Sequence, residues 1–145
     1  QAATNLATIQ GWSDRRFQPT PDHDPELSSK LLDAHQRIQG AINHDLNTPQ
    51  ALAELLALIA WMDSRELGEA DLPQFNELIT YIDQILGLRL LERADIDSES
   101  RATIVQRQKL KDEGDFEGAD NLRAQLLQAG IELTDTAHGP RWHRL

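Results

Sequence analysis

An aromatic ring, a carboxylate and a guanidinium share one side of a helix that the sequence predicts near the end of the chain. On a helical wheel with about 100° per residue, Asp120 and Arg123 fall within about 40° of Phe116. An exposed ring gives an unpaired base a surface for stacking, which contributes about 1–3 kcal/mol per base. A carboxylate accepts hydrogen bonds from a base edge, and such contacts discriminate between bases by about 1–3 kcal/mol. The spacing therefore suggests recognition of an unpaired base.

The same residues also have purely structural explanations, and spacing alone favours them. Phe116 stands in the first turn, where an aromatic side chain can pack under the preceding loop as a hydrophobic staple. Asp120 and Arg123 are three positions apart and can form an exposed ion pair worth about 0.2–0.5 kcal/mol. Trp142 is expected to fill the core of a small hairpin.

The elements that must position these residues are mainly helices. Apolar residues recur at every three or four positions and predict helices over residues 26–42, 72–86 and 115–129. Residues 4–17 can form a short helix, and residues 100–112 have helical composition but a poor apolar stripe. A further helix, ending near Met62, begins at Asn47-Thr48-Pro49, where Asn47 or Thr48 can cap the first turn and Pro49 suits it. Gly87 and Gly130 are expected to stop two of the helices.

The last helix and the segment after it have a recognisable pattern. Ala119, Leu122, Leu126 and Ala129 form one predicted buried stripe on that helix. Ile131 and Leu133 alternate with polar residues, as in a half-buried strand. Residues 137–140 then supply a turn, and residues 141–143 can return as the partner strand.

Together these elements predict a mainly α fold: an antiparallel helical bundle followed by a small α+β subdomain with a two-stranded hairpin. The expected division is a bundle over residues 1–91, a polar linker over 92–100 and the subdomain over 101–145. Because the chain begins with Gln1 and not with Met, we expect a fragment or a processed product.

Composition limits the possible partners. The net charge is −10, with 7 basic and 15 acidic side chains in residues 1–95 and 7 and 9 in residues 96–145. Phosphate contacts need Lys and Arg, so this balance argues against non-specific nucleic-acid binding, and we expect no DNA partner. Any RNA contact should be local and base-reading. No apolar run approaches the roughly 18 residues that span a bilayer, so we expect no membrane partner. The lack of cysteine fits a reducing cytoplasm, which is the location we expect.

Several types of site are excluded or weak. Cysteine is absent, which excludes disulfides, thiolate metal sites and a cysteine nucleophile. Asp22-His23-Asp24 could contact a metal, but prolines flank it in a loop, and we expect no metal site. No glycine-rich phosphate loop appears, and no nucleophile lies beside a base, so an independent hydrolase is improbable.

The chain resembles the C-terminal region of cysteinyl-tRNA synthetases. Asn47-Thr48-Pro49 with Ala51 and Leu52 is similar to the segment that opens a bundle helix in that family. The more specific resemblance lies at the end of the chain and covers the following positions: Arg107, Asp115, Phe116, Ala119, Asp120, Leu122, Arg123, Leu126, Gly130, Ile131, Leu133, Asp135, Thr136, Gly139 and Trp142.

The resemblance implies that the chain binds the anticodon of cysteine tRNA. By its match to the family pattern, Phe116 would stack on a base, and Asp120 and Asp135 would accept hydrogen bonds from bases. Lys111 corresponds to a basic residue of the preceding helix, and Arg107, Arg123 and Arg141 would support the contact. Guanine and cytosine of the anticodon G-C-A present donor groups that carboxylates can accept.

The resemblance also implies partners and cofactors outside these 145 residues. The ATP-site signatures and zinc-binding cysteines of the family are missing, so ATP and zinc would belong to a separate catalytic domain, with no cofactor in this chain. The chain alone would then carry no catalytic site and would be part of a cysteine–tRNA ligase. Gly114 and Thr134 depart from the usual Lys and Glu, which weakens the expected binding. The alternative is a free-standing helical adaptor of the same architecture that binds protein.

Overall fold

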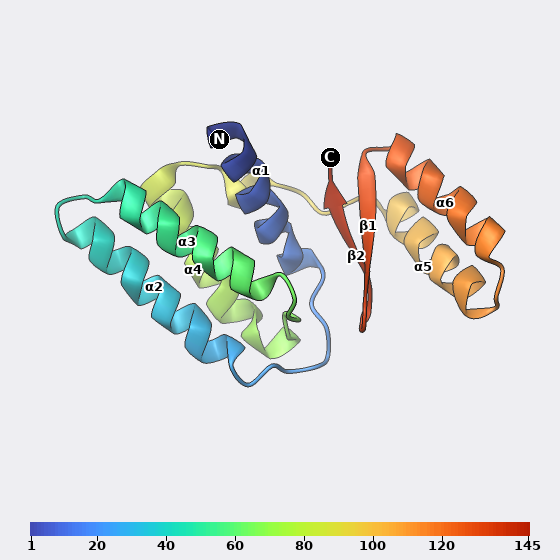
Figure 1. Cartoon of the computed structure of the whole chain (residues 1–145), viewed down its shortest axis with the longest axis horizontal. Coiled ribbons are helices and arrows are strands. Elements are labelled where there is room, and N and C mark those ends of the chain that lie inside the picture. Colours follow the sequence, from blue (N-terminus) through green and yellow to red (C-terminus); the bar gives the residue numbers. More distant parts are fainter. The chain divides into compact units, whose positions relative to one another are not determined.

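The computed structural model describes all 145 residues and divides them into two compact units, Gln1–Arg93 and Ala94–Leu145. We call them unit 1 and unit 2. The boundary falls inside residues 92–100, where the linker is expected. Helices make up unit 1, whereas unit 2 combines two helices with an antiparallel hairpin, so the predicted mainly α fold with a C-terminal hairpin is confirmed (Figure 1).

The bounds of the elements follow the chain. Unit 1 contains α1 (Ala2–Ser13), the 3₁₀ helix η1 (Asp14–Phe17), α2 (Leu27–Asn43), α3 (Thr48–Met62), the 3₁₀ helix η2 (Glu69–Asp71), α4 (Leu72–Leu86) and the 3₁₀ helix η3 (Leu90–Glu92). Unit 2 contains α5 (Ser98–Asp112), α6 (Phe116–Gln128), β1 (Ile131–Thr136) and β2 (Gly139–Arg144).

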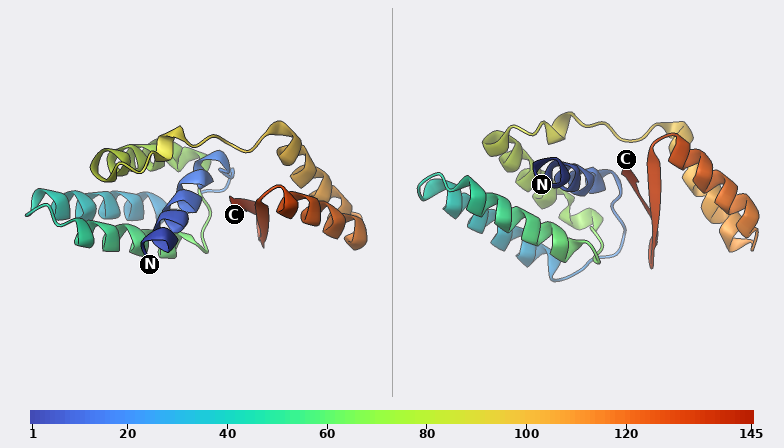
Figure 2. Two further views of the ribbon diagram at one scale, coloured as in Figure 1. Left: turned by 90° about the horizontal axis from the view of Figure 1, so that it is seen from above. Right: turned by 45° about the horizontal axis from the view of Figure 1, so that its top comes forward.

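Unit 1 is a bundle around one apolar core. Helices α2 and α3 run antiparallel side by side, α4 packs against α2, and α1 packs against α3 (Figure 2). Phe75 of α4 is fully buried and meets the ring of Trp12 of α1 edge-on, with 5.0 Å between ring centroids. The largest fully buried side chains of the unit are those of Leu27, Leu31, Ile38, Leu55, Met62, Leu67, Phe75, Leu78, Ile79, Ile82 and Leu90.

Local signals in unit 1 set the helix ends. Asn47 caps α3, because its side-chain oxygen accepts a hydrogen bond of 3.1 Å from the backbone N–H of Gln50. Gly87 ends α4 with a φ of 63°, a left-handed conformation that favours glycine. Helix α1 is shorter than expected, since it ends at Ser13 and residues 14–17 tighten into η1. There the guanidinium of Arg15 donates to the backbone oxygen of Met62 at 2.7 Å, which holds this turn against α3.

Unit 2 packs a helical hairpin on the β-hairpin. The turn between α5 and α6 contains Gly114 at a φ of 83°. In the β-hairpin, Leu133 pairs with Trp142 and Thr136 pairs with Gly139, so the strands are joined by two residues. The expected turn over residues 137–140 is therefore too long. Pro140, which lacks a backbone N–H, can lie within β2 because a two-stranded hairpin has only edge strands.

Two further expectations in unit 2 need correction. Helix α5 begins at Ser98, inside the segment expected to be a linker, because Asp97 accepts a hydrogen bond of 2.7 Å from the backbone N–H of Ser100 and caps it. Ala129 is exposed and not part of the buried stripe. The α-helix ends at Gln128, so Ala129 lies beyond the last helical turn. Trp142 is buried at 3% exposure, as expected.

Candidate nucleic-acid interface

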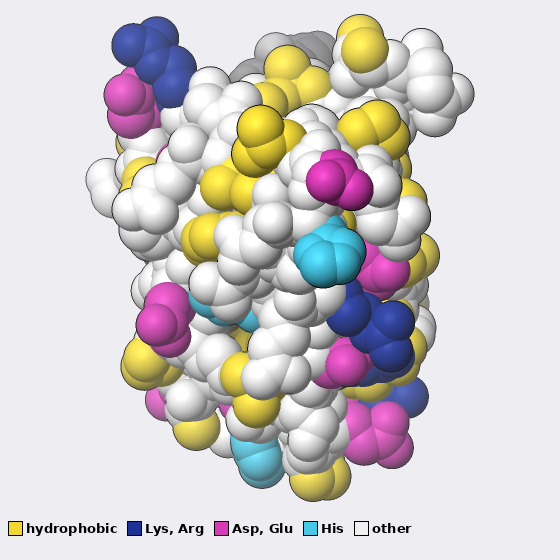
Figure 3. All heavy atoms as spheres, turned by 90° about the vertical axis from the view of Figure 1, so that its left-hand side faces the viewer, with side chains coloured by type: hydrophobic (Ala, Val, Ile, Leu, Met, Phe, Trp, Pro, Cys, Tyr) yellow, Lys and Arg dark blue, Asp and Glu magenta, His cyan; other side chains and the backbone are white.

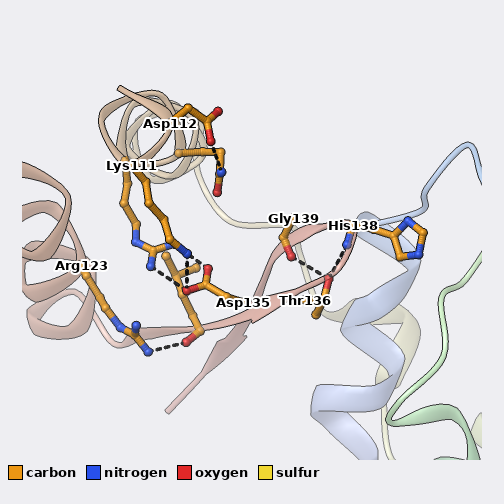
Figure 4. A network of polar contacts seen from close by, with 10 residues as sticks. Lys111, Asp112, Arg123, Asp135, Thr136, His138 and Gly139 are labelled. Atoms are coloured by element: carbon orange, nitrogen blue, oxygen red, sulfur yellow. Dashed lines mark hydrogen bonds and ion pairs between the residues drawn. The ribbon is translucent and has the colours of Figure 1, made fainter. Parts of the chain in front are cut away.

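Three of the residues expected to contact RNA converge at one point in unit 2. Arg107 and Lys111 lie one turn apart on α5, and both side chains contact Asp135 of β1. Figure 4 shows Lys111 pointing toward Asp135. The two terminal nitrogens of Arg107 donate to the two carboxylate oxygens of Asp135 at 2.8 and 3.0 Å. Lys111 Nζ donates to Oδ2 of Asp135 at 3.0 Å. This cluster fixes helix α5 to the β-hairpin.

Burial makes the pair between Arg107 and Asp135 structurally important. The Arg107 side chain is 3% exposed, whereas that of Asp135 is 35% exposed. Hydrogen bonds from Arg107 hold the pKa of Asp135 well below its usual range; partial burial opposes this shift and the hydrogen bond from Lys111 adds to it. The hydrogen bond to Asp135 likewise raises the pKa of Arg107. The carboxylate therefore stays ionised and keeps both cations in place.

The lowered pKa of Asp135 predicts acid sensitivity of unit 2. A carboxyl group whose pKa is lower in the folded state stabilises that state fully above its unfolded pKa of about 3.9. The stabilisation is lost as the pH falls below that value toward the lowered pKa. We expect the urea midpoint of unit 2 to fall between pH 5 and pH 2, followed through the indole resonance of Trp142. In a double variant, Arg107→Leu with Asp135→Ala, the urea midpoint should fall less over this pH range, because no carboxyl group at position 135 is left to be protonated.

Phe116 and Asp120 form the exposed part of the candidate site. Phe116 is 63% exposed, so the staple explanation for its ring is wrong. Asp120 is exposed one turn later on α6, on the same side of the helix, and neither of its oxygens has a hydrogen-bond or ion-pair partner within the chain. Its charge still acts on Arg107, whose pKa it helps to raise. An exposed ring and a carboxylate with open acceptor positions are thus neighbours.

The remaining two candidate residues have other surroundings. Arg123 donates to the backbone oxygen of Leu133 at 2.9 Å and so holds α6 against β1 (Figure 4). The proposed ion pair between Arg123 and Asp120 does not form. Arg141 is half-buried on β2, opposite Thr134, and already interacts within the chain. Both guanidinium groups already interact within the chain, so they have fewer hydrogen-bond donors left for the supporting RNA contact that was expected of them.

Acceptor positions decide what the two carboxylates can still bind. Each carboxylate offers about four lone-pair sites on its two oxygens. All of those on Asp120 are open. On Asp135, Oδ2 already accepts from Arg107 and Lys111, and Oδ1 accepts from Arg107 and retains one position. Asp120 can therefore accept two donors side by side, whereas Asp135 can accept only one more.

Nothing in the chain is arranged as a metal centre or a membrane span. Across the 145 residues, no group of three or more His, Cys, Asp or Glu side chains is placed to hold a metal ion. None of the helices is both long enough and apolar enough to cross a bilayer.

Part of unit 1 is similar to a known domain family. Residues 37–91, from the second half of α2 to η3, match the DALR domain. In this chain the matched segment is followed by unit 2, which carries the cluster around Asp135.

Full-length relatives extend the match to nearly the whole chain. The chain is 29% identical to a cysteine–tRNA ligase of Streptococcus mutans over 143 residues, which is 99% of the chain and 30% of that protein. It is 33% identical to a cysteine–tRNA ligase of Xanthomonas campestris in an alignment of 151 positions, gaps included, that covers 92% of the chain and 33% of that protein. The resemblance to cysteinyl-tRNA synthetases is confirmed. The chain spans about a quarter to a third of the length of the curated relatives it matches.

Proposed function

We propose that the chain is the anticodon-binding region of a cysteine–tRNA ligase. It would position cysteine tRNA for ATP-dependent aminoacylation by the catalytic domain of the same synthetase, and it would work in the cytoplasm. The observation that carries the proposal is the exposed pair of Phe116 and Asp120 on unit 2, within a chain that matches cysteine–tRNA ligases over up to 99% of its length. ATP and zinc would be bound by the catalytic domain and not by these residues.

The open acceptor positions suggest which base of the anticodon each carboxylate would contact. Guanine presents two adjacent donors on its Watson–Crick edge, an imino N–H and an amino group, and both oxygens of Asp120 are open to them. Cytosine and adenine each present one amino group there, and Asp135 has one position left at Oδ1. We therefore assign Asp120 to the guanine of the anticodon and Asp135 to an amino group of a neighbouring base. Phe116 would stack on the base that Asp120 reads.

Lys111 has a separate part in this proposal. Its ammonium donates one hydrogen bond to Asp135 and is 35% exposed, so two donors remain for RNA. Arg107 is almost fully buried and would act through Asp135 by holding the carboxylate in place. Arg107 is thus a positioning residue, and Lys111 is the cation that would touch RNA.

Base reading predicts a selective loss of RNA binding. Asp120→Asn should weaken binding of cysteine tRNA by about 5–150-fold, which corresponds to about 1–3 kcal/mol for a lost edge contact. Phe116→Ala should cause a loss of similar size because base stacking is removed. Asp120→Asn should not change binding of a tRNA with an altered anticodon, whereas Phe116→Ala can weaken both RNAs because any base can stack on the ring. The measurement is a titration of the chain with both RNAs at low salt.

The matched control is Glu117→Gln, which removes one exposed carboxylate from the same helix without touching the proposed site. This variant should bind both RNAs as the parent chain does. An equal loss of both RNAs for Asp120→Asn would contradict base reading. Absence of binding to either RNA would contradict the proposed function and favour the protein-binding adaptor, which none of the comparisons supports.

A further inference from the structure

An apolar hollow without charged side chains lies at the end of unit 1 where α1 begins. It has a volume of about 420 Å³, and its apolar walls are Leu6 and Ile9 of α1, Leu52 of α3, and Leu86 and Leu88 at the end of α4. Its other lining groups are small or carry uncharged amides and a hydroxyl. On the side of the molecule that faces left in Figure 1, hydrophobic side chains gather over the upper half (Figure 3).

Helix α1 differs from every other α-helix of the chain because it has no charged residue. Residues 1–13 contain no Asp, Glu, Lys or Arg, and the first charged side chain is Asp14. Only three residues of α1 are buried, namely Ile9, Trp12 and Ser13. Ala2, Ala3, Leu6 and Ala7 are exposed, with Leu6 at 38%. A helix that faced water on this side would be expected to carry charged side chains there.

Depletion of charge around an apolar depression is typical of the core of a protein interface. The bundle as a whole is rich in charge, with 7 basic and 14 acidic side chains in residues 1–93. The uncharged surface is therefore a local property of α1 and the ends of α3 and α4. No Lys or Arg side chain lines the hollow to bind phosphates, so an apolar protein surface is a better fit for it than a nucleic acid.

Relatives indicate which protein supplies that surface. The cysteine–tRNA ligase of Streptococcus mutans matches 99% of this chain with only 30% of its own length. More than two thirds of that relative therefore consists of other protein, synthesised together with a segment similar to α1. We propose that the hollow and the exposed side of α1 receive an apolar segment of the catalytic part of a cysteine–tRNA ligase. This inference rests on the proposed function, because it identifies where the synthetase partner docks.

Hydrogen–deuterium exchange tests the docking surface directly. The comparison is between the 145-residue chain alone and a hybrid in which it replaces the matching third of the Xanthomonas campestris ligase. We expect amides of residues 2–8 to exchange at least tenfold more slowly in the hybrid. Leu6→Glu should remove this protection in the hybrid. Leu32→Glu, which alters an exposed leucine of α2 outside the hollow, should leave it unchanged.

Each result decides the inference. Equal exchange of residues 2–8 in the chain and the hybrid would overturn it. Protection that survives Leu6→Glu would also overturn it, because the added chain would then be slowing exchange without filling the hollow. If the isolated chain is a dimer that Leu6→Glu dissociates, a second copy covers the surface and the inference is wrong. The titration with tRNA probes unit 2 of the isolated chain, so its failure and failure of docking are separate results.

Discussion

Asp135→Ala is expected to lower the free energy of unfolding of unit 2 by about 3 kcal/mol. The substitution leaves the guanidinium of Arg107 at 3% exposure without the carboxylate that accepts two of its hydrogen bonds. Removing one partner of a buried ion pair costs about 3–5 kcal/mol. We take the lower end because Asp135 itself is 35% exposed. Urea unfolding followed through the indole resonance of Trp142, the tryptophan of unit 2, measures the effect.

Two further variants distinguish the effect of breaking the buried ion pair from the effect of removing a carboxylate. Asp120→Ala removes an exposed carboxylate that has no partner, and it should change stability by no more than about 0.5 kcal/mol. Arg107→Leu combined with Asp135→Ala removes both charges and should recover much of the stability, since a buried pair replaced by apolar groups is often close to neutral. A double variant as unstable as Asp135→Ala alone would contradict this explanation. The result also means that RNA binding by Asp135 variants must be compared only where unit 2 is folded.

Arg93→Ala is expected to destabilise unit 1 by about 3–5 kcal/mol. Arg93 donates from Nε and Nη2 to the two oxygens of Asp14 at 2.8 and 2.7 Å. The Asp14 side chain is 1% exposed and keeps a further interaction within the chain, but the substitution removes its bidentate partner from a buried position. The pair also joins η1 to the residue that follows η3, 79 positions later in the chain. The indole resonance of Trp12 reports on this unit during urea unfolding.

Arg89→Ala provides the control for Arg93→Ala. Arg89 forms an ion pair of 3.3 Å with Glu92, in which both side chains are more than two-thirds exposed. Exposed pairs of this kind contribute at most about 1 kcal/mol. If Arg89→Ala and Arg93→Ala destabilise unit 1 equally, burial does not determine the strength of these pairs.

Helix ends could be predicted from the sequence because their signals are local. Asn47 caps α3 and Pro49 occupies its first turn, as their residue types indicate. Gly87 ends α4 with a positive φ that a residue with a Cβ rarely adopts. Each of these signals needs only the few residues beside it, so no knowledge of packing is required. Ala129 shows the limit of such local signals. Apolar periodicity assigned it to the buried stripe of α6, but the helix ends one residue earlier, at Gln128.

Pairs of charges between distant elements could not be predicted in the same way. Arg107 and Asp135 are 28 positions apart, and neither helical nor strand periodicity relates them. Resemblance named both residues as RNA contacts, but it did not indicate that they bind each other. Burial of Arg107 depends on how α5 packs on the β-hairpin, and a helical wheel of α5 alone gives no information about that packing. The exposure of Phe116 likewise depends on the path of the chain into α6.

The engagement of its guanidinium groups bears on how unit 2 would respond to ionic strength. Arg107 is buried against Asp135, and Arg123 is bound to the backbone of β1, so these two side chains are already committed within the unit. Few counterions would then be displaced from RNA when it binds, and added salt would compete only weakly. Contact made by stacking and hydrogen bonds would persist as the concentration of salt rises and falls. Such a surface would bind RNA less tightly than a cationic one, but its selectivity would change little with salt.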